Sequence, residues 1–304
     1  MALAKRKAKP CLAGRQALPY RLKDLINNAL WEDIGSGDIT SELLIPKNKK
    51  IKAIILLKEK AVIAGLGIAE KVFKSIDRKI KFKAKCLEGS LQDRGKILAV
   101  LEGGARNILL AERTALNFLT HLCGVASLVH SFVREVKPSR VKILDTRKTI
   151  PGLRNLQKYA VVLGGGYNHR IGLWDEVLIK DNHISASCVM RSAPCVKELL
   201  EVAKKKMPGG MKIEIEVKNL REFKEALKAG PDIIMLDNMN ISDIGKAVAI
   251  RRKTQDSRLK TLLEVSGGVN LANVRAIAKT GADMISIGCL THSVKAIDIS
   301  LEIP

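Results

Sequence analysis

Charged residues gather at the points where two apolar segments of this sequence end. Residues 141–144 and 177–179 are strand-like apolar runs, which end in Asp-Thr-Arg-Lys and in Lys-Asp-Asn-His. A His-Arg pair lies between these two segments. Five side chains that are or can be cationic are therefore expected at the edge where the strands end: Arg147, Lys148, His169, Arg170 and Lys180. Like charges held together need an anion to offset their repulsion. The stretch therefore predicts a site for a polyanionic ligand.

Acidic and glycine-rich residues end the later strands. Glu214 and Glu216 alternate along one strand and share a face, so one of the two carboxylates is expected to point into the fold. Together with Asp237 after the next strand, Glu216 suits ribose hydroxyls or Mg²⁺, which prefers oxygen ligands. Backbone N–H groups after the last two strands are expected to bind phosphate. They belong to Ser266, Gly267, Gly268, Ile287, Gly288 and Cys289.

The elements that must position these residues alternate regularly after residue 137. Six apolar or β-branched runs are expected to be strands: Val141–Leu144, Val177–Ile179, Lys212–Val217, Ile233–Leu236, Leu262–Val265 and Met284–Ile287. Helical periodicity lies between them, at Ala193–Lys206, Leu220–Ala229, Asp243–Lys253 and Leu271–Thr280. Alternating β and α elements indicate a parallel sheet. The pattern predicts an open, incomplete β/α barrel of six or seven strands over residues 125–291, with a doubly wound sheet as the alternative.

The first 124 residues follow a different pattern. Residues 1–19 hold five basic and no acidic residues and are expected to be a disordered tail. Residues 20–124 mix short strands and helices, which predicts a compact α+β domain of normal size. A long helical region follows over residues 105–137, with a break or bend expected near Gly124. Within this helix, Glu112 and Arg113 are interpreted from the residues alone as a solvated pair.

Composition indicates a soluble globular protein with an aliphatic core. Of 304 residues, 46% are hydrophobic and only 3% are aromatic, and no uninterrupted apolar run approaches the roughly 18 residues of a membrane span. Six cysteines without a Cys-x-x-Cys pair, and no apolar segment after the basic N-terminus, predict free thiols in the cytoplasm. The net charge of +22 fits nucleic-acid binding or phosphorylated substrates, but no nucleic-acid motif accompanies it. A lysine-rich solvated surface is the preferred explanation.

The ordered set of motifs resembles the quinolinate phosphoribosyltransferase family, the decarboxylating nicotinate-nucleotide pyrophosphorylases. Upstream, GDIT at residues 37–40 and AERTALNFL at residues 111–119 are similar to that family. The barrel region adds DTRKT, PGLR, KYAV, GGG, NHR, LIKDNH, IEIEV, MLDN, EVSGGVN and IGCLTHS. The similarity extends from about residue 20 to the C-terminus. It implies an N-terminal α/β sandwich domain over residues 20–124, an open barrel, and a C-terminal segment, residues 292–304, that packs on the N-terminal domain.

The resemblance also implies a reaction and a role for each residue. Quinolinate and phosphoribosyl pyrophosphate would give nicotinate mononucleotide, pyrophosphate and CO₂ with Mg²⁺. Arg147, His169 and Arg170 would hold the quinolinate carboxylates with help from Thr146, and Lys148 and Lys180 would bridge the two substrate sites. Glu216 and Asp237 would face the ribose and the metal ion, and the two glycine-rich segments would bind the 5-phosphate. Arg113 would enter from a neighbouring subunit of a dimer or hexamer.

Three alternatives stay open at the level of the sequence. A related family linked to molybdenum transport shares the TRKT and GGG regions, although LIKDNH is closer to the biosynthetic enzymes. Another sugar-phosphate barrel enzyme would use Lys180 as an imine-forming amine. A polyanion-binding protein would use the high positive charge, and tight DNA binding at physiological salt would support it.

Overall fold

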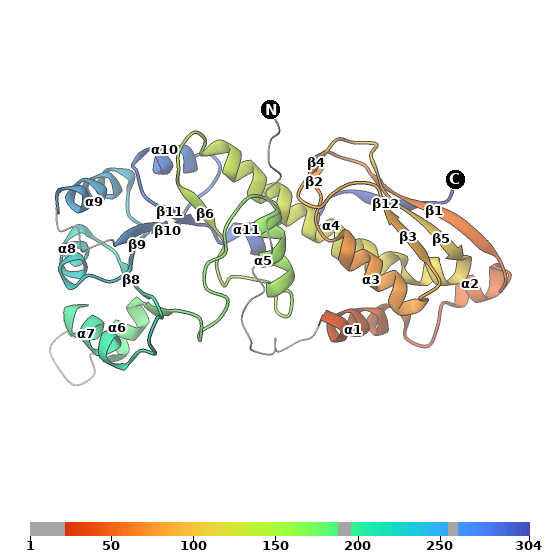
Figure 1. The fold of residues 1–304 in the computed structure, drawn as a ribbon, viewed down its shortest axis with the longest axis horizontal. Helices are drawn as coiled ribbons and strands as arrows, with labels where there is room; N and C mark the ends of the chain where they lie inside the picture. Colours follow the sequence, from red (N-terminus) through yellow and green to blue (C-terminus); the bar gives the residue numbers. More distant parts are fainter. Residues whose placement is uncertain (1–21, 188–195, 255–260) are drawn as a thin grey trace, which may run out of the picture.

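The computed structural model describes residues 22–187, 196–254 and 261–304. The expected disordered tail, residues 1–19, lies outside the described residues, and so does the start of the helix expected at residues 193–206. In the described part, the chain forms two α/β domains with a long helix, α4 (Ala105–Glu135), running between them (Figure 1). The mixed α/β class predicted from the sequence is confirmed.

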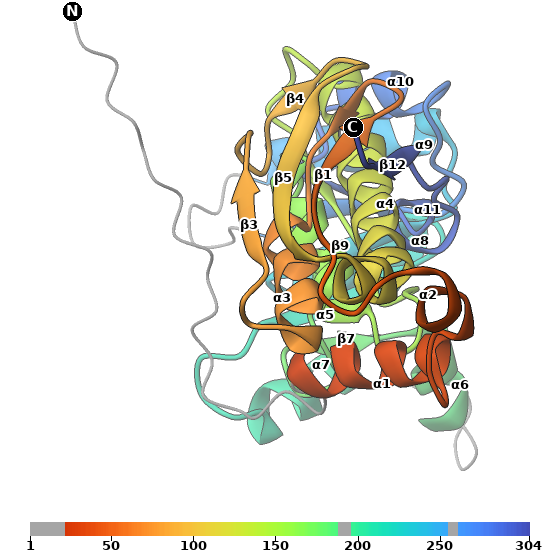
Figure 2. The same cartoon turned by 90° about the vertical axis from the view of Figure 1, so that its right-hand side faces the viewer.

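The N-terminal domain is built on a four-stranded antiparallel sheet with the strand order β12-β1-β5-β3. Along β1, Ala53, Ile55 and Leu57 are buried and the residues between them are less so, because successive side chains of a strand face opposite sides. Figure 2 looks onto this sheet, with α4 behind it. The elements of the domain are α1 (Leu22–Ile34), α2 (Ile39–Leu44), β1 (Lys50–Leu57), β2 (Ala61–Val62), α3 (Leu66–Ile76), β3 (Lys81–Ala84), β4 (Leu91–Gln92), β5 (Ile97–Gly104) and β12 (Ile299–Glu302).

The long helix α4 is continuous through Gly124, so the break that was one form of the expectation there does not occur. A Cβ atom at residue 124 would lie 2.3 Å from the carbonyl oxygen of Lys295 and 2.8 Å from the side chain of Val294. Glycine is therefore needed at this position for close packing of the C-terminal segment against the helix. The chain beyond Lys295 then continues into β12, which pairs with β1 at the edge of the N-terminal sheet.

Burial explains why α4 is so apolar. Its length and composition alone would allow it to cross a membrane, but half of its most apolar stretch is buried inside the protein. Its buried face includes Leu116, Leu119 and Phe132, and it packs against α3 and α5 (Arg154–Leu163). This is the behaviour of the core helix of a two-domain protein, and α4 joins the cores of both domains.

The second domain holds a six-stranded, all-parallel sheet with the order β6-β11-β10-β9-β8-β7. The first strand in sequence lies beside the last, and the remaining strands follow in sequence order. This is the circular order of a β/α barrel, opened between β6 and β7, whereas a doubly wound sheet reverses its order in the middle. The open, six-stranded barrel is thus confirmed, and its strands are β6 (Lys142–Leu144), β7 (Val177–Ile179), β8 (Ile213–Val217), β9 (Ile233–Asp237), β10 (Leu262–Ser266) and β11 (Met284–Ser286).

Helices follow the strands and cover the outside of this sheet (Figure 1). They are α5, α6 (Asp181–Ser187), α7 (Val196–Lys206), α8 (Leu220–Ala229), α9 (Ile241–Lys253), α10 (Val274–Lys279) and α11 (Cys289–His292). More than half of the bounds expected for the strands and helices of this domain agree exactly, and the others that fall on described residues differ by one to three residues. Because every strand runs in the same direction, all six carboxyl ends meet at one edge of the sheet.

Candidate active site

The carboxyl ends of the barrel strands surround a cavity of about 600 Å³. All the predicted site residues between positions 146 and 289 line it: Thr146, Arg147, Lys148, His169, Arg170, Lys180, Glu216, Asp237, Ser266, Gly267, Gly268, Ile287, Gly288 and Cys289. A neighbouring cavity of about 550 Å³, beside α6 and α8, shares only Glu216 with it. The larger cavity is the candidate active site, since it joins the cationic, acidic and glycine-rich strand ends.

Two arginines give the cavity its cationic character. The guanidinium Nε of Arg147 is buried and has no hydrogen-bond partner within the part of the chain that the structure describes. Arg170 is 6% exposed and donates to the carbonyl oxygen of Glu176 at 3.0 Å. Burial, and secondly the nearby Arg147, lower the pKa of Arg170. A buried and a half-buried guanidinium group that repel each other, one of them with a free donor, are what an anionic ligand would stabilise.

Two carboxylates approach each other in the same cavity. Burial and then the charge of Asp237 raise the pKa of Glu216, which shows that the two groups repel each other. Lys180 lies 3.7 Å from the Glu216 carboxylate, between Nζ and Oε2, and partly offsets this repulsion. Lys180 is thus an ion-pair partner in this structure, which does not favour the alternative role of an imine-forming amine. Two carboxylates beside a phosphate-binding loop can also hold a divalent cation or ribose hydroxyls.

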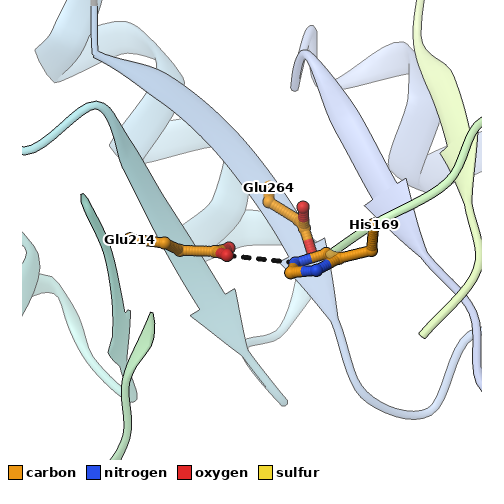
Figure 3. A group of neighbouring side chains, drawn as sticks. All are labelled: His169, Glu214 and Glu264. Atoms are coloured by element: carbon orange, nitrogen blue, oxygen red, sulfur yellow. Dashed lines mark ion pairs between the residues drawn. The ribbon is translucent and has the colours of Figure 1, made fainter. Parts of the chain in front are cut away.

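A second pair of carboxylates lies deeper, inside the barrel. Glu214 and Glu264 both converge on the ring of His169 (Figure 3). His169 Nε2 is 3.0 Å from Oε2 of Glu214 and 3.5 Å from Oε1 of Glu264. Glu214, which is fully buried against His169, meets the expectation that one of Glu214 and Glu216 points into the fold. Glu216 lines the cavity beside Lys180. Sequence reasoning overlooked Glu264, since EVSGG reads as a phosphate loop.

Both glutamates of this buried pair favour their protonated form. Burial, and then the charge of Glu214, raise the pKa of Glu264 to about 8. Burial, and then Glu176, raise the pKa of Glu214. No well-directed hydrogen bond reaches either carboxylate in the described chain, although His169 lies near both, Glu176 near Glu214 and Ser286 near Glu264. Burying an ionised carboxylate without several hydrogen-bond donors costs free energy, so the protonated form of each glutamate is the more stable one.

The hydrogen bonds of His169 define its tautomer. The backbone N–H of Arg170 donates to Nδ1 at 2.7 Å, so Nδ1 must be the unprotonated nitrogen. The ring proton then sits on Nε2, the nitrogen that lies near Glu214 and Glu264. The three side chains are close enough together to hold a metal ion. With its proton on Nε2, however, the imidazole offers no lone pair to a metal at that point.

A buried ion pair fixes the backbone of His169. Lys158, on α5, lies 2.5 Å from Asp145 and also donates to the carbonyl oxygen of His169 at 2.8 Å. The backbone N–H of His169 donates to the same Asp145 carboxylate at 2.8 Å. Asp145 was expected among the charged residues at the edge where the strands end, but it is fully buried beneath them. Asp145 and Lys158 therefore hold the loop that carries His169 and Arg170 in place.

The glycine-rich strand ends present backbone donors to the cavity. Gly267 and Gly268 have φ values of +90° and +61°, a region that favours glycine. In the described part of the chain, no hydrogen bond occupies the N–H groups of these two residues. A Cβ at Gly288 would approach the side chains of Lys148 and His292 to 3.0 and 3.1 Å. Free N–H groups in the loop after β10 suit a phosphate group.

The cavity also contains residues that the sequence did not single out. Asn238 and His292 both line it. His292 lies at the end of α11, and Asn238 directly follows Asp237. The asparagine in MLDN carried a signal, because asparagine tolerates a left-handed backbone. By contrast, Arg113 is exposed on α4 and does not line the cavity of its own chain.

Comparison with known proteins gives a consistent result. The model of the quinolinate phosphoribosyl transferase N-terminal domain matches residues 38–123, and that of the C-terminal domain matches residues 125–302. A probable nicotinate-nucleotide pyrophosphorylase [carboxylating] of Methanocaldococcus jannaschii is 43% identical, over 93% of this chain and 97% of that protein. The nicotinate-nucleotide pyrophosphorylase of Francisella tularensis superposes with a TM-score of 0.84 at 39% identity, over 93% of this chain and 96% of that one. The enzyme of Ehrlichia chaffeensis gives 0.85 at 41%, over 94% and 100%.

These relatives carry the same fold over nearly their whole length, and each is named for the same activity. That agreement supports the main reading of the sequence over a molybdenum-transport relative or another sugar-phosphate enzyme. Both family domains occur in order along the chain. The chain belongs to the quinolinate phosphoribosyltransferase family.

Proposed function

We propose that this protein transfers a phosphoribosyl group from phosphoribosyl pyrophosphate to quinolinate and decarboxylates the product. Nicotinate mononucleotide, pyrophosphate and CO₂ result, which places the reaction in the biosynthesis of NAD. The observation that carries the proposal is the single cavity at the strand ends, which combines a buried and a half-buried arginine, paired carboxylates and free glycine N–H groups. An anionic acceptor and a phosphorylated sugar donor require this combination in one place.

The acceptor side of the proposal rests on the cations. Arg147 and Arg170 would each bind a carboxylate of quinolinate, because a guanidinium group offers paired donors to a carboxylate. The free Nε of Arg147 is available for such a bond. Thr146 and Lys148 follow β6, as Arg147 does, and Lys180 directly follows β7. His169 would support this site from below, since both its ring nitrogens already face protein groups.

The donor side rests on the acidic and glycine-rich strand ends. The segments Ser266–Gly268 and Ile287–Cys289 would bind the 5-phosphate, with the free N–H groups of Gly267 and Gly268 as its donors. The N–H of Ile287 already donates to the carbonyl oxygen of Leu144 at 2.9 Å. Glu216 and Asp237 would face the ribose hydroxyls. The two carboxylates also fit Mg²⁺, because their mutual repulsion, which raises the pKa of Glu216, would be relieved by a divalent cation. When bound, Mg²⁺ would neutralise charge on the pyrophosphate group.

The proposed chemistry has two steps. In the first, the pyridine nitrogen forms a bond to C1 of the ribose while the bond from C1 to the pyrophosphate oxygen breaks. Positive charge develops on the sugar, and Glu216 and Asp237 stabilise it, while Lys148 and Lys180 stabilise the departing phosphate oxygens. In the second, the bond to the 2-carboxyl carbon breaks, CO₂ leaves, and the electron pair on C2 takes a proton. The adjacent cationic ring nitrogen stabilises that pair, so the protein chiefly orients and neutralises.

The proposed active site is shared between subunits of a dimer or hexamer, with Arg113 supplied by a neighbour. Arg113 is exposed and remote from its own chain's cavity, which supports a role in another chain. The N-terminal domain also exposes large apolar side chains that a neighbouring subunit could bury. Trp31 on α1 is 77% exposed, and Leu43 and Leu44 on α2 are 78% and 75% exposed. Monomeric proteins rarely expose large apolar groups in such density.

The proposed location is the cytoplasm. Among the described cysteines, Cys86, Cys123 and Cys289 are free thiols. Burial raises the pKa of Cys123 to about 12, which makes it an unreactive core residue. Free buried thiols suit a reducing compartment.

The proposed function can be tested with purified protein, quinolinate, phosphoribosyl pyrophosphate and Mg²⁺. Chromatography should show formation of nicotinate mononucleotide only when all three are present. Nicotinate serves as the comparison substrate because it lacks the second carboxylate that the two arginines would bind. Turnover of nicotinate at a rate equal to that of quinolinate would contradict the assignment.

A further inference from the structure

Asn238 has a backbone conformation that sets it apart from the other residues at the strand ends. Its φ is +52°, and among the described non-glycine residues it alone has a positive φ. Its backbone N–H donates to the carbonyl oxygen of Ser266 at 2.9 Å, which ties the end of β9 to the end of β10. A left-handed backbone is unfavourable for a non-glycine residue, although asparagine tolerates it better than most residues. Strain of this kind is often retained at functional sites.

The side chain of Asn238 lies between two groups of the donor site. Its Nδ2 donates to Oδ2 of Asp237 at 2.8 Å. Its amide also covers Gly267, because a Cβ at that glycine would lie only 2.2 Å from Oδ1 of Asn238. One amide therefore touches both the candidate ribose carboxylate and the loop that presents N–H groups to phosphate.

A turn residue alone would not require this amide. If only the left-handed backbone mattered, glycine would serve at position 238 without steric cost. The amide does more than fill space, because it donates to one oxygen of Asp237, a residue that lines the cavity. It also limits how far the Gly267 loop can move toward β9.

We propose that Asn238 is a positioning residue that fixes the Asp237 carboxylate relative to the Ser266–Gly268 loop. It would thereby set the separation at which the ribose and the 5-phosphate of one sugar phosphate are bound. The inference rests on the proposed function for the identity of that sugar phosphate. The contacts of Asn238 with Asp237 and Gly267 carry it independently of the acceptor.

Two substitutions separate this role from that of a simple turn. Asn238→Gly keeps the left-handed backbone and removes the amide. Asn238→Asp keeps the shape and the contact with Gly267, but it replaces the donor with an acceptor that repels Asp237. Both variants should keep the wild-type thermal midpoint within a few degrees, because neither disturbs the buried core.

The expected effects concern the donor substrate alone. Calorimetry with phosphoribosyl pyrophosphate, with and without Mg²⁺, should show an affinity about 10- to 100-fold weaker in both variants, the range seen when groups that orient a ligating carboxylate are removed. The KM for the same substrate should rise in parallel, and the Kd for quinolinate should stay at the wild-type value. An Asn238→Gly variant that binds phosphoribosyl pyrophosphate as well as the wild type would overturn the proposal.

The outcomes also distinguish this inference from the proposed function. If wild-type protein binds phosphoribosyl pyrophosphate without turning over quinolinate, the proposed acceptor is wrong. The affinity of the variants for phosphoribosyl pyrophosphate, relative to that of the wild type, then still tests the role of Asn238. If the wild-type protein does not bind phosphoribosyl pyrophosphate, both are overturned. If either variant loses thermal stability and affinity for both substrates together, Asn238 is a structural residue and the positioning role is rejected.

Discussion

At the scale of single residues, the cavity concentrates positive charge that the protein itself does not neutralise. Arg147 keeps a buried donor without a partner in the described chain, and Arg170 is almost fully buried beside it. Below them, two glutamates with raised pKa values lie beside His169. The resulting site has a cationic upper layer, which an anionic substrate would complete, and a lower layer with little net charge.

Replacing Arg147 or Arg170 with alanine should weaken quinolinate binding selectively. Each loses a charge-assisted hydrogen bond to a carboxylate, worth about 1.5–3 kcal/mol, or roughly a 10- to 150-fold rise in Kd. Calorimetric titration with quinolinate measures this, and the affinity for phosphoribosyl pyrophosphate should change far less. Arg94→Ala, an exposed arginine of the N-terminal domain, is the matched control. Unchanged quinolinate affinity in both cavity variants would contradict the assigned roles.

Replacing Glu264 with glutamine should flatten the dependence of stability on pH. The folded protein raises the pKa of Glu264 from 4.5 to about 8, so the folded state keeps a proton that the unfolded state releases between these values. The free energy of unfolding therefore falls as pH rises through that window, by at most a few kcal/mol for this group. Glutamine mimics the neutral carboxyl and removes this loss.

The check is chemical denaturation at pH 5.5 and pH 8.5. The loss of unfolding free energy between the two should be smaller in Glu264→Gln than in the wild type. The exposed Glu198 gives the control substitution, Glu198→Gln, which should leave the change in unfolding free energy between the two pH values as it is in the wild type. Equal slopes for Glu264→Gln and the wild type would show that Glu264 is ionised in the folded protein.

At the scale of elements, the strand ends were predictable and the layer beneath them was not. Apolar runs that end in charged or glycine residues are local patterns, and a parallel sheet brings all carboxyl ends to one edge. The roles of Asp145, Lys158 and Glu264 depend on contacts between distant segments: Lys158 reads as one polar position of a helix, yet it is buried against Asp145. No local pattern distinguishes a buried charge with a distant partner from a solvated one.

The long helix α4 is a second case in which a contact between distant segments could not be predicted from the local sequence. A glycine within a helix suggests a break, because glycine is a poor helix former. Here the helix continues through Gly124, and the reason lies about 170 residues later in the sequence, in the carbonyl oxygen of Lys295 that packs against it. Contacts of this kind become visible only when the fold is known.

Substituting Gly124 with alanine should destabilise the protein although alanine is the better helix former. The added Cβ would lie 2.3 Å from the Lys295 carbonyl oxygen, so the C-terminal segment must shift. Overpacking of this kind typically costs about 1–3 kcal/mol. Gly67→Ala is the matched control, since Gly67 lies in α3 and nothing is within 4 Å of its added Cβ. That change should be neutral or stabilising by up to about 1 kcal/mol, and denaturant unfolding compares the two. If the Gly124→Ala protein were as stable as the Gly67→Ala protein, the C-terminal segment would move away from the added Cβ at no cost in stability, and the prediction would be wrong.

At the scale of the whole molecule, the two domains are joined by more than the helix. The chain leaves the barrel after α11 and returns to pair β12 with β1 in the N-terminal sheet. The N-terminal domain is therefore tied to the barrel at two places, although none of its described residues lines its own chain's cavity. A domain held in this way could complete the site of a second chain.

Complementation should reveal a shared active site. Arg113→Ala and Lys148→Ala should each be nearly inactive, because each removes one of two groups that act in the same site on different chains. When the two variants are mixed, dissociated and reassembled, some sites should combine an intact Arg113 with an intact Lys148. In a randomly mixed dimer population about a quarter of all sites would be whole, since a two-fold interface pairs each site across both chains.

The control for this experiment is mass spectrometry of the reassembled protein, which must show mixed oligomers. Mixed oligomers with activity that stays at the level of the single variants would mean that Arg113 acts in its own chain or has no role in catalysis. Reassembly of each variant with itself should restore nothing.

The most direct test of the account as a whole follows the 2-carboxyl group of quinolinate. Quinolinate labelled with ¹³C at that carboxyl is incubated with the protein and Mg²⁺, with and without phosphoribosyl pyrophosphate. If one cavity binds both substrates and transfers the sugar before the carboxyl is lost, labelled CO₂ and pyrophosphate appear in equal amounts, and only when phosphoribosyl pyrophosphate is present. Labelled CO₂ without the sugar phosphate, or pyrophosphate without labelled CO₂, would contradict the account.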